Sequence, residues 1–215
     1  YVIGKLGSGD YTSFGDAIAS LSSGIGGPVV FEVVSDGTSY EEPISIPEIP
    51  GTSSTNTITF RPDPGNTDPV VLTYASTTEV DNYTLKLNGI DYLTINDLTI
   101  KATGSTYARV IEITNGSTYN TFTDCRIEGV SETDELVFSD PETDDNFSNT
   151  FTGNVFMNGS SGIYLRGSAL ADGLVVKKNE FNNQSENGIY IHDYENAVID
   201  SNYIHSSYAI KGIWI

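Results

Sequence analysis

One short pattern recurs in the last third of the chain: SGIYLRG at 161–167, NGIYIHD at 187–193 and KGIWI at 211–215. Its isoleucines stand at positions 163, 189 and 213, so the steps are 26 and 24 residues. Short β-prone runs that return every twenty-odd residues, separated by Gly, Asn and Ser turns, are typical of a solenoid in which each repeat forms one coil. The pattern therefore predicts an all-β fold, a parallel β-helix.

A second unit of six residues can be aligned over five coils. Its first and sixth positions are always large and apolar, so we expect both to point into the core. Its fourth position reads, in order, Leu98, Cys125, Asn154, Asn179 and Asn202. Equivalent residues of successive coils lie about 4.8 Å apart, which lets stacked side-chain amides hydrogen-bond to one another. The sequence therefore predicts a structural ladder of the three asparagines at one turn.

The beginning of the chain predicts one helix. In DYTSFGDAIASLSSG at 10–24, the residues Phe14, Ala17, Ile18 and Leu21 share one helical face, and Gly24 ends the pattern. We expect a capping helix at about 13–22, with its apolar face over the first coil. The whole of 1–215 is expected to form one β-helix domain. Because the chain stops within a repeat, we also expect it to be the N-terminal piece of a longer protein.

Composition limits the classes of partner. The formal net charge of the 215 residues is −19, from 29 acidic and 10 basic side chains. Such a surface repels phosphate backbones, so no nucleic-acid partner is expected. No apolar run approaches the roughly 18 residues of a membrane-spanning helix. The single cysteine, Cys125, cannot form an intrachain disulfide and falls where a small buried residue is expected.

Three segments carry a resemblance to known proteins: YVIGKLGSGDYTSFGDAIASL at 1–21, GGPVVFEV at 26–33 and IPEIPGTSSTNTITF at 46–60. With the repeats, the chain resembles the right-handed parallel β-helix, or pectin lyase-like, superfamily of pectate lyases and polygalacturonases. The opening is similar to N-terminal regions of large secreted and cell-surface β-helix proteins of the Bacteroidota. The resemblance implies an extracellular or outer-surface location and export by the type IX machinery, through a C-terminal sorting domain that these 215 residues lack.

Alternation in the recurring strand places Tyr164, Tyr190 and Trp214 on the outer surface, in one column. Arg166 and His192 form the next outward column. Aromatic rings bordered by polar groups are suited to bind sugars, so these five residues form our candidate glycan-binding site. The alternative is that the rings only stabilise the sheet through cross-strand stacking.

The sequence supports a catalytic site less well than it supports a glycan-binding surface. The paired aspartates and the GHG motif of polygalacturonases are absent, although Tyr190, His192 and Asp193 are close enough in sequence to supply a base. The sequence therefore favours a non-catalytic adhesin or glycan-contacting surface protein with a polysaccharide partner. Two alternatives stay open. One is the N-terminal part of a polysaccharide lyase or glycoside hydrolase whose catalytic coils follow residue 215, and the other is a passive stalk.

One acidic run could hold a cation. Residues 139–146 contain four acids, Asp140, Glu142, Asp144 and Asp145. Calcium takes several oxygen ligands from one flexible loop, but this run lacks the spaced Asp-x-Asp-x-Asp-Gly pattern. A weak Ca²⁺ site and a solvated loop are both compatible with it, and no other cofactor is expected.

Overall fold

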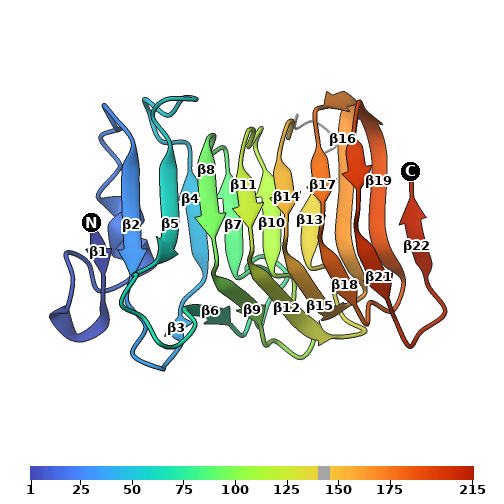
Figure 1. The fold of residues 1–215 in the computed structure, drawn as a ribbon, viewed down its shortest axis with the longest axis horizontal. Coiled ribbons are helices and arrows are strands. Elements are labelled where there is room, and N and C mark those ends of the chain that lie inside the picture. The colour runs from blue at the N-terminus through green and yellow to red at the C-terminus, as the bar shows by residue number, and fades with distance from the viewer. Residues whose placement is uncertain (140–145) are drawn as a thin grey trace.

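The computed structural model describes residues 1–139 and 146–215, without the side chains at 6 and 168–170, and shows the chain coiling about one long axis (Figure 1). Short strands of successive coils pair in parallel and build three sheets that surround one apolar core. Within the described residues, sheet A has eight strands and sheets B and C have seven each. The predicted fold class, an all-β parallel β-helix, is confirmed.

From residue 29 onward, each coil contributes one strand to each sheet in turn. Sheet A contains β1 (Val2–Ile3), β2 (Val29–Val33), β5 (Ile58–Pro62), β8 (Leu93–Asn96), β11 (Thr121–Thr123), β14 (Thr150–Thr152), β17 (Val175–Lys177) and β20 (Val198–Asp200). Sheet B contains β3 (Tyr40–Glu41), β6 (Val71–Tyr74), β9 (Thr99–Ala102), β12 (Arg126–Ser131), β15 (Val155–Gly159), β18 (Glu180–Asn182) and β21 (Tyr203–His205). Sheet C contains β4 (Ile44–Pro47), β7 (Leu85–Asn88), β10 (Ile111–Thr114), β13 (Val137–Ser139), β16 (Ser161–Asp172), β19 (Asn187–Glu195) and β22 (Lys211–Trp214).

The core follows the register predicted from the six-residue unit. The first position lies in sheet A, where Phe151 pairs with Phe122 on one side and with Val176 on the other. The sixth position lies in sheet B, where Phe156 pairs with Phe181. The rings of Phe156 and Phe181 are stacked with centroids 4.5 Å apart and are fully buried. Identical positions of successive coils therefore pack on one another along the axis.

The fourth position of the unit turns the chain from sheet A to sheet B, and the structure brings Asn154, Asn179 and Asn202 together there. The Asn154 Nδ2 group donates to Asn179 Oδ1 over 3.0 Å, and Asn179 Nδ2 donates to Asn202 Oδ1 over 3.0 Å. The same carboxamide oxygens accept backbone N–H groups, which the neighbouring coil presents at 2.9 Å. The amides thus satisfy the backbone groups that the turn leaves unpaired inside the molecule.

Cys125 occupies the same column, where its backbone N–H donates to Asn154 Oδ1 over 2.9 Å. Burial raises the pKa of its thiol to about 12, so the native protein holds almost no thiolate at neutral pH. We expect no reaction of Cys125 with a thiol reagent at pH 8 in buffer and one equivalent in denaturant. Fast labelling of the native protein, measured by mass spectrometry, would contradict the buried position.

Helix α1 (Phe14–Ala19) covers the first coil, and it is shorter than predicted. Ser13 begins it by accepting the Asp16 N–H over 3.0 Å. After Ala19 the chain tightens into turns instead of continuing to residue 22, because the N–H of Leu21 bonds to Ile18 O and that of Gly24 to Leu21 O. The apolar face, with Phe14, Ala17, Ile18 and Leu21, is buried against the core as expected.

A carboxylate from another segment also caps this helix. Glu42 Oε1 accepts the Phe14 N–H over 2.9 Å, and Glu42 Oε2 accepts the Gly15 N–H over 3.1 Å. A negative charge beside the first helical N–H groups is favourable, because the helix dipole points its positive end there. Glu42 therefore fixes the helix to the segment that follows β3.

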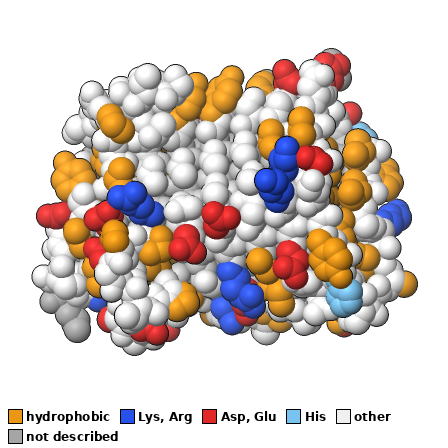
Figure 2. Space-filling view, in the orientation of Figure 1, with side chains coloured by type: hydrophobic (Ala, Val, Ile, Leu, Met, Phe, Trp, Pro, Cys, Tyr) orange, Lys and Arg blue, Asp and Glu red, His pale blue; other side chains and the backbone are white. Residues whose placement is uncertain are grey.

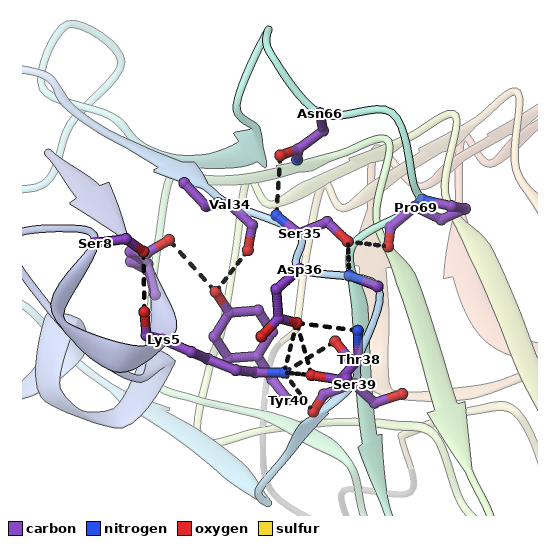
Figure 3. A network of polar contacts seen from close by, with 12 residues as sticks. Lys5, Ser8, Val34, Ser35, Asp36, Thr38, Ser39, Tyr40, Asn66 and Pro69 are labelled. Carbon is purple, nitrogen blue, oxygen red and sulfur yellow. Dashed lines mark hydrogen bonds and ion pairs between the residues drawn. The ribbon is translucent and has the colours of Figure 1, made fainter.

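Lys5 makes several polar contacts with the loop at 36–39 (Figure 3). Lys5 Nζ donates to Thr38 Oγ1 over 2.6 Å and to Ser39 O over 2.8 Å, and it lies 3.4 Å from Asp36 Oδ1. The same ammonium group lies 4.5 Å from the centroid of the Tyr40 ring. Lys5 thereby links the turn η1 (Lys5–Gly7) to the loop at 36–39.

This network predicts a pH dependence. Hydrogen bonds from the side chain and backbone of Thr38, with help from Lys5, lower the pKa of Asp36 to about 2. A carboxyl with a depressed folded-state pKa stabilises the protein above its unfolded value near 3.9, and this contribution is lost as the pH falls toward 2. We expect an Asp36→Asn variant to melt below the wild type at pH 5 by circular dichroism, with a difference that shrinks on acidification. A difference independent of pH would contradict this role.

The outer face of sheet A is polar and mostly uncharged in its middle (Figure 2). Parallel pairing aligns four threonines in one column, Thr59, Thr94, Thr121 and Thr150. Arg61 stands toward one end of this face and Lys177 toward the other. The outward aromatic residues predicted from the sequence lie on a different face, that of sheet C.

Candidate functional site

Four aromatic side chains form one column on the outer face of sheet C, which we call the aromatic column: Phe138, Tyr164, Tyr190 and Trp214. Strand pairing sets it, because Tyr164 pairs with Phe138 in β13 and Tyr190 in β19, and Tyr190 pairs with Trp214 in β22. The ring centroids are 5.8, 4.4 and 4.4 Å apart in order along the column. The structure thus brings together the three rings that the sequence assigned to this face.

The rings are stacked face to face. Tyr164 and Tyr190 are inclined by 7°, and Tyr190 and Trp214 by 3°. Parallel rings at 4.4 Å can only be in stacked contact, because rings lying side by side in one plane would need a much wider centroid separation. Both faces of Tyr190 are therefore covered by its neighbours. A sugar could not stack on the faces of this ring, and the column presents ring edges and polar tips outward.

Phe138 was missed by sequence reasoning. It lies 26 residues before Tyr164, which is the step of the repeat, but its segment VFS has none of the glycine that marks the later copies. The Arg109 guanidinium carbon lies 3.7 Å from the centroid of the Phe138 ring. The aromatic column is thus extended by a cation–π contact toward the middle of the molecule.

Arg109 is itself held in place. Its Nη2 lies 3.7 Å from Glu135 Oε2, and its side chain is only 11% exposed. Burial, together with the charges of Asp134 and Glu186, raises the pKa of the Glu135 carboxyl despite the nearby guanidinium. Between its carboxylate and its aromatic ring, Arg109 has little surface left for a ligand.

Arg166 and His192 form the second column, since β16 and β19 pair them directly. His192 Nδ1 lies 2.7 Å from Asp193 Oδ2, and the His192 ring is stacked with Trp214 at 5.9 Å. Asp193 has a φ of 59°, so the strand turns there and returns the carboxylate to the preceding histidine. Gly167 lies against this bend: a Cβ at Gly167 would meet Asp193 O at 2.5 Å.

The chemistry available at the site is mainly hydrogen bonding. His192 and Asp193 make a surface pair in which the side chains are 41% and 50% exposed, and Tyr190 lies two residues earlier on the same strand. Among the described residues there is no group of three or more His, Cys, Asp or Glu that could hold a metal ion. The acids proposed for calcium, Asp140, Glu142, Asp144 and Asp145, lie outside the described residues, so that expectation stays a prediction.

A cleft of about 590 Å³ lies away from the aromatic column, between the loop 62–69 and the corner of sheets A and B. Its two arginines are already paired, Arg61 with Glu32 at 2.7 Å and Arg126 with Glu128 at 2.9 Å.

Over the described part of the chain, no helix is long and apolar enough to cross a membrane.

Comparisons with known proteins agree with this architecture. A family model described as "Right handed beta helix region" matches residues 142–214. A solved structure, pectin methylesterase from carrot, superimposes with a TM-score of 0.62 at 16% sequence identity. The match covers 92% of this chain and 63% of that enzyme, so this chain spans less than two thirds of the enzyme's length. The comparison with curated proteins found no match. The fold is therefore a right-handed parallel β-helix.

Proposed function

We propose that this chain is a secreted or cell-surface β-helix module that contacts a polysaccharide along the aromatic column of sheet C and has no catalytic role of its own. The observation that supports it is the register of β16, β19 and β22, which aligns Tyr164, Tyr190 and Trp214 beside Arg166 and His192. Location at the outer surface and type IX export follow from the resemblance of the N-terminal segments.

The stack suggests how a sugar chain would be held. The three rings are half-buried, and the Tyr190 hydroxyl has no hydrogen-bond partner among the described residues. A polysaccharide running along the axis would meet ring edges and polar tips at the spacing of successive strands, about 4.8 Å. Because each inner ring is fixed by its neighbours, binding would immobilise few side chains, which keeps the entropic cost low.

The first test is truncation. We expect Tyr190→Ala to weaken binding of the preferred polysaccharide by about tenfold, because a central aromatic residue commonly contributes more than 1 kcal/mol to an interface. Affinity is measured by gel retardation or calorimetry over a panel of neutral and acidic polymers. Tyr203→Ala is the matched control, since Tyr203 is 61% exposed on sheet B, away from the column, and should leave affinity unchanged. If no polymer binds the wild-type protein, the proposal fails.

A second variant tests the contact mode. Tyr190→Phe keeps the stacked ring and removes only the hydroxyl, so we expect an unchanged melting temperature. If sugars meet the tips of the column, the variant loses a hydrogen bond worth about 0.5–1.5 kcal/mol, which is roughly a two- to tenfold loss of affinity. Equal binding by the variant and the wild type would show that the hydroxyl is not in contact.

A passive stalk is the second candidate, and the mutual covering of the ring faces favours it. Cross-strand aromatic pairs stabilise a sheet whether or not a ligand is present. If the column has only this role, Tyr190→Ala lowers the melting temperature and no glycan binds. The two candidates therefore differ in the binding measurement, while both predict some loss of stability.

A further inference from the structure

We infer that the aromatic column selects an uncharged polysaccharide and rejects polyuronates. This inference rests on the proposed function and adds the substrate class. Uronate carboxylates are recognised through charge-assisted bonds from arginine or lysine, most strongly when both guanidinium nitrogens are available. The question is therefore which cations beside the column a ligand could reach.

Two of these cations are paired within the protein. Lys86 Nζ lies 3.2 Å from Glu112 Oε2, and both residues belong to the column that Phe138 and the later rings continue. Arg109 lies against the Phe138 ring and is paired with Glu135. Because each charge is matched by a carboxylate of the neighbouring coil, the part of sheet C that precedes the rings offers no net positive charge.

The basic side chains next to the rings also have partners, with one exception. His192 bonds Asp193 at 2.7 Å, and Arg166 has an interaction of its own as well. Lys211 is exposed and has no polar partner among the described residues. It pairs with Asn187 at the start of β19, so the exposed Glu186 lies beside it. Lys211 therefore has one acid, Glu186, next to it in the sheet edge.

The net charge of the whole molecule also disfavours a negatively charged ligand. At a formal net charge of −19, the protein repels a polyanion before contact and slows its association at low ionic strength. A carboxylate brought onto the column would lose water and could gain only Lys211 as a free cation among the described residues. Uncharged hydroxyl groups, which both donate and accept, match the Tyr190 hydroxyl and the ring edges without this cost.

The experiment compares polymers that differ only in charge. Uncharged polymers, including fully methyl-esterified polygalacturonan and a neutral glucan, are each paired with a carboxylated form of the same backbone: the de-esterified polygalacturonate and the carboxymethylated glucan. Binding to the 215-residue protein is measured at low and at high ionic strength. We expect the uncharged member of the pair to bind at least tenfold more tightly at low ionic strength, with a gap that narrows as salt is added.

A charge variant separates electrostatics from shape. Glu186→Lys places a second cation beside Lys211 without touching the aromatic column, so it should improve binding of the carboxylated polymer severalfold and leave the uncharged one unchanged. Equal or tighter binding of a carboxylated polymer to the wild type would overturn the inference while the proposed function stands. If neither member of any pair binds, the proposed function itself fails, and the inference with it.

Discussion

A Phe151→Ala variant is expected to lose about 3–5 kcal/mol of unfolding free energy, the usual cost of removing a buried phenylalanine ring. Phe151 is fully buried, and its ring is stacked on Phe122 with centroids 5.2 Å apart and an inclination of 5°. It also lies 6.4 Å from the Phe156 ring, which comes from sheet B. Truncation therefore opens a cavity where two sheets meet, in the middle of the solenoid.

Phe151→Leu and Thr152→Ala are the controls for this measurement. Phe151→Leu keeps most of the apolar volume and should lose clearly less stability than the alanine variant. Thr152→Ala changes a half-buried outward side chain on the same strand and should stay within about 0.5 kcal/mol of the wild type. Urea titration followed by circular dichroism gives all three values. A loss below about 1 kcal/mol for Phe151→Ala would mean that the coils do not share one packed core.

The sequence predicted the parts of the fold in which each coil repeats its predecessor. Phe151 and Phe156 could be assigned to the core because large apolar residues return at the same two positions in every aligned coil. The pairing of Tyr164 with Tyr190 followed from the recurring Gly-Ile-Tyr in the same way. In a parallel solenoid, one repeat length fixes all three sheets at once, so a correct step gives the register of most strands.

Contacts that do not repeat could not be predicted. Glu42 caps a helix that begins 28 residues earlier, and no periodic pattern marks that contact. Arg109 and Phe138 meet through side-chain orientation, which strand alternation does not determine. The orientation of the rings could not be predicted for the same reason. Alternation places Tyr190 outside the core, but only the side-chain torsions decide whether the ring turns its face or its edge to the solvent. The mutual covering of the ring faces at the candidate site therefore came from the structure.

An Asn179→Ala variant is expected to lose about 3 kcal/mol of unfolding free energy, because it leaves buried backbone groups unpaired. Asn179 Oδ1 accepts the Asn154 N–H over 2.9 Å, and its Nδ2 donates to Phe151 O over 2.9 Å. Alanine can replace neither bond, and the unpaired groups lie away from bulk solvent, since Asn154 and Asn179 are 0% and 2% exposed. For a chain of this size the melting temperature should fall by about 6–12 °C.

The loss of unfolding free energy should depend on the position of the substituted asparagine along the ladder. Asn202 is half-buried and bonded to only one neighbouring rung of the ladder, so Asn202→Ala should cost less than Asn179→Ala. Asn182→Ala is the neutral control, since among the described residues that side-chain amide bonds only Glu180 Oε1, at the surface. In a solenoid each coil is stabilised by its two neighbours, so the Asn179 variant should lose hydrogen-exchange protection first in β14, β17 and β20 and last near α1. Uniform loss along the whole chain would show instead that the coils unfold as one unit, and that the ladder stabilises all of them together.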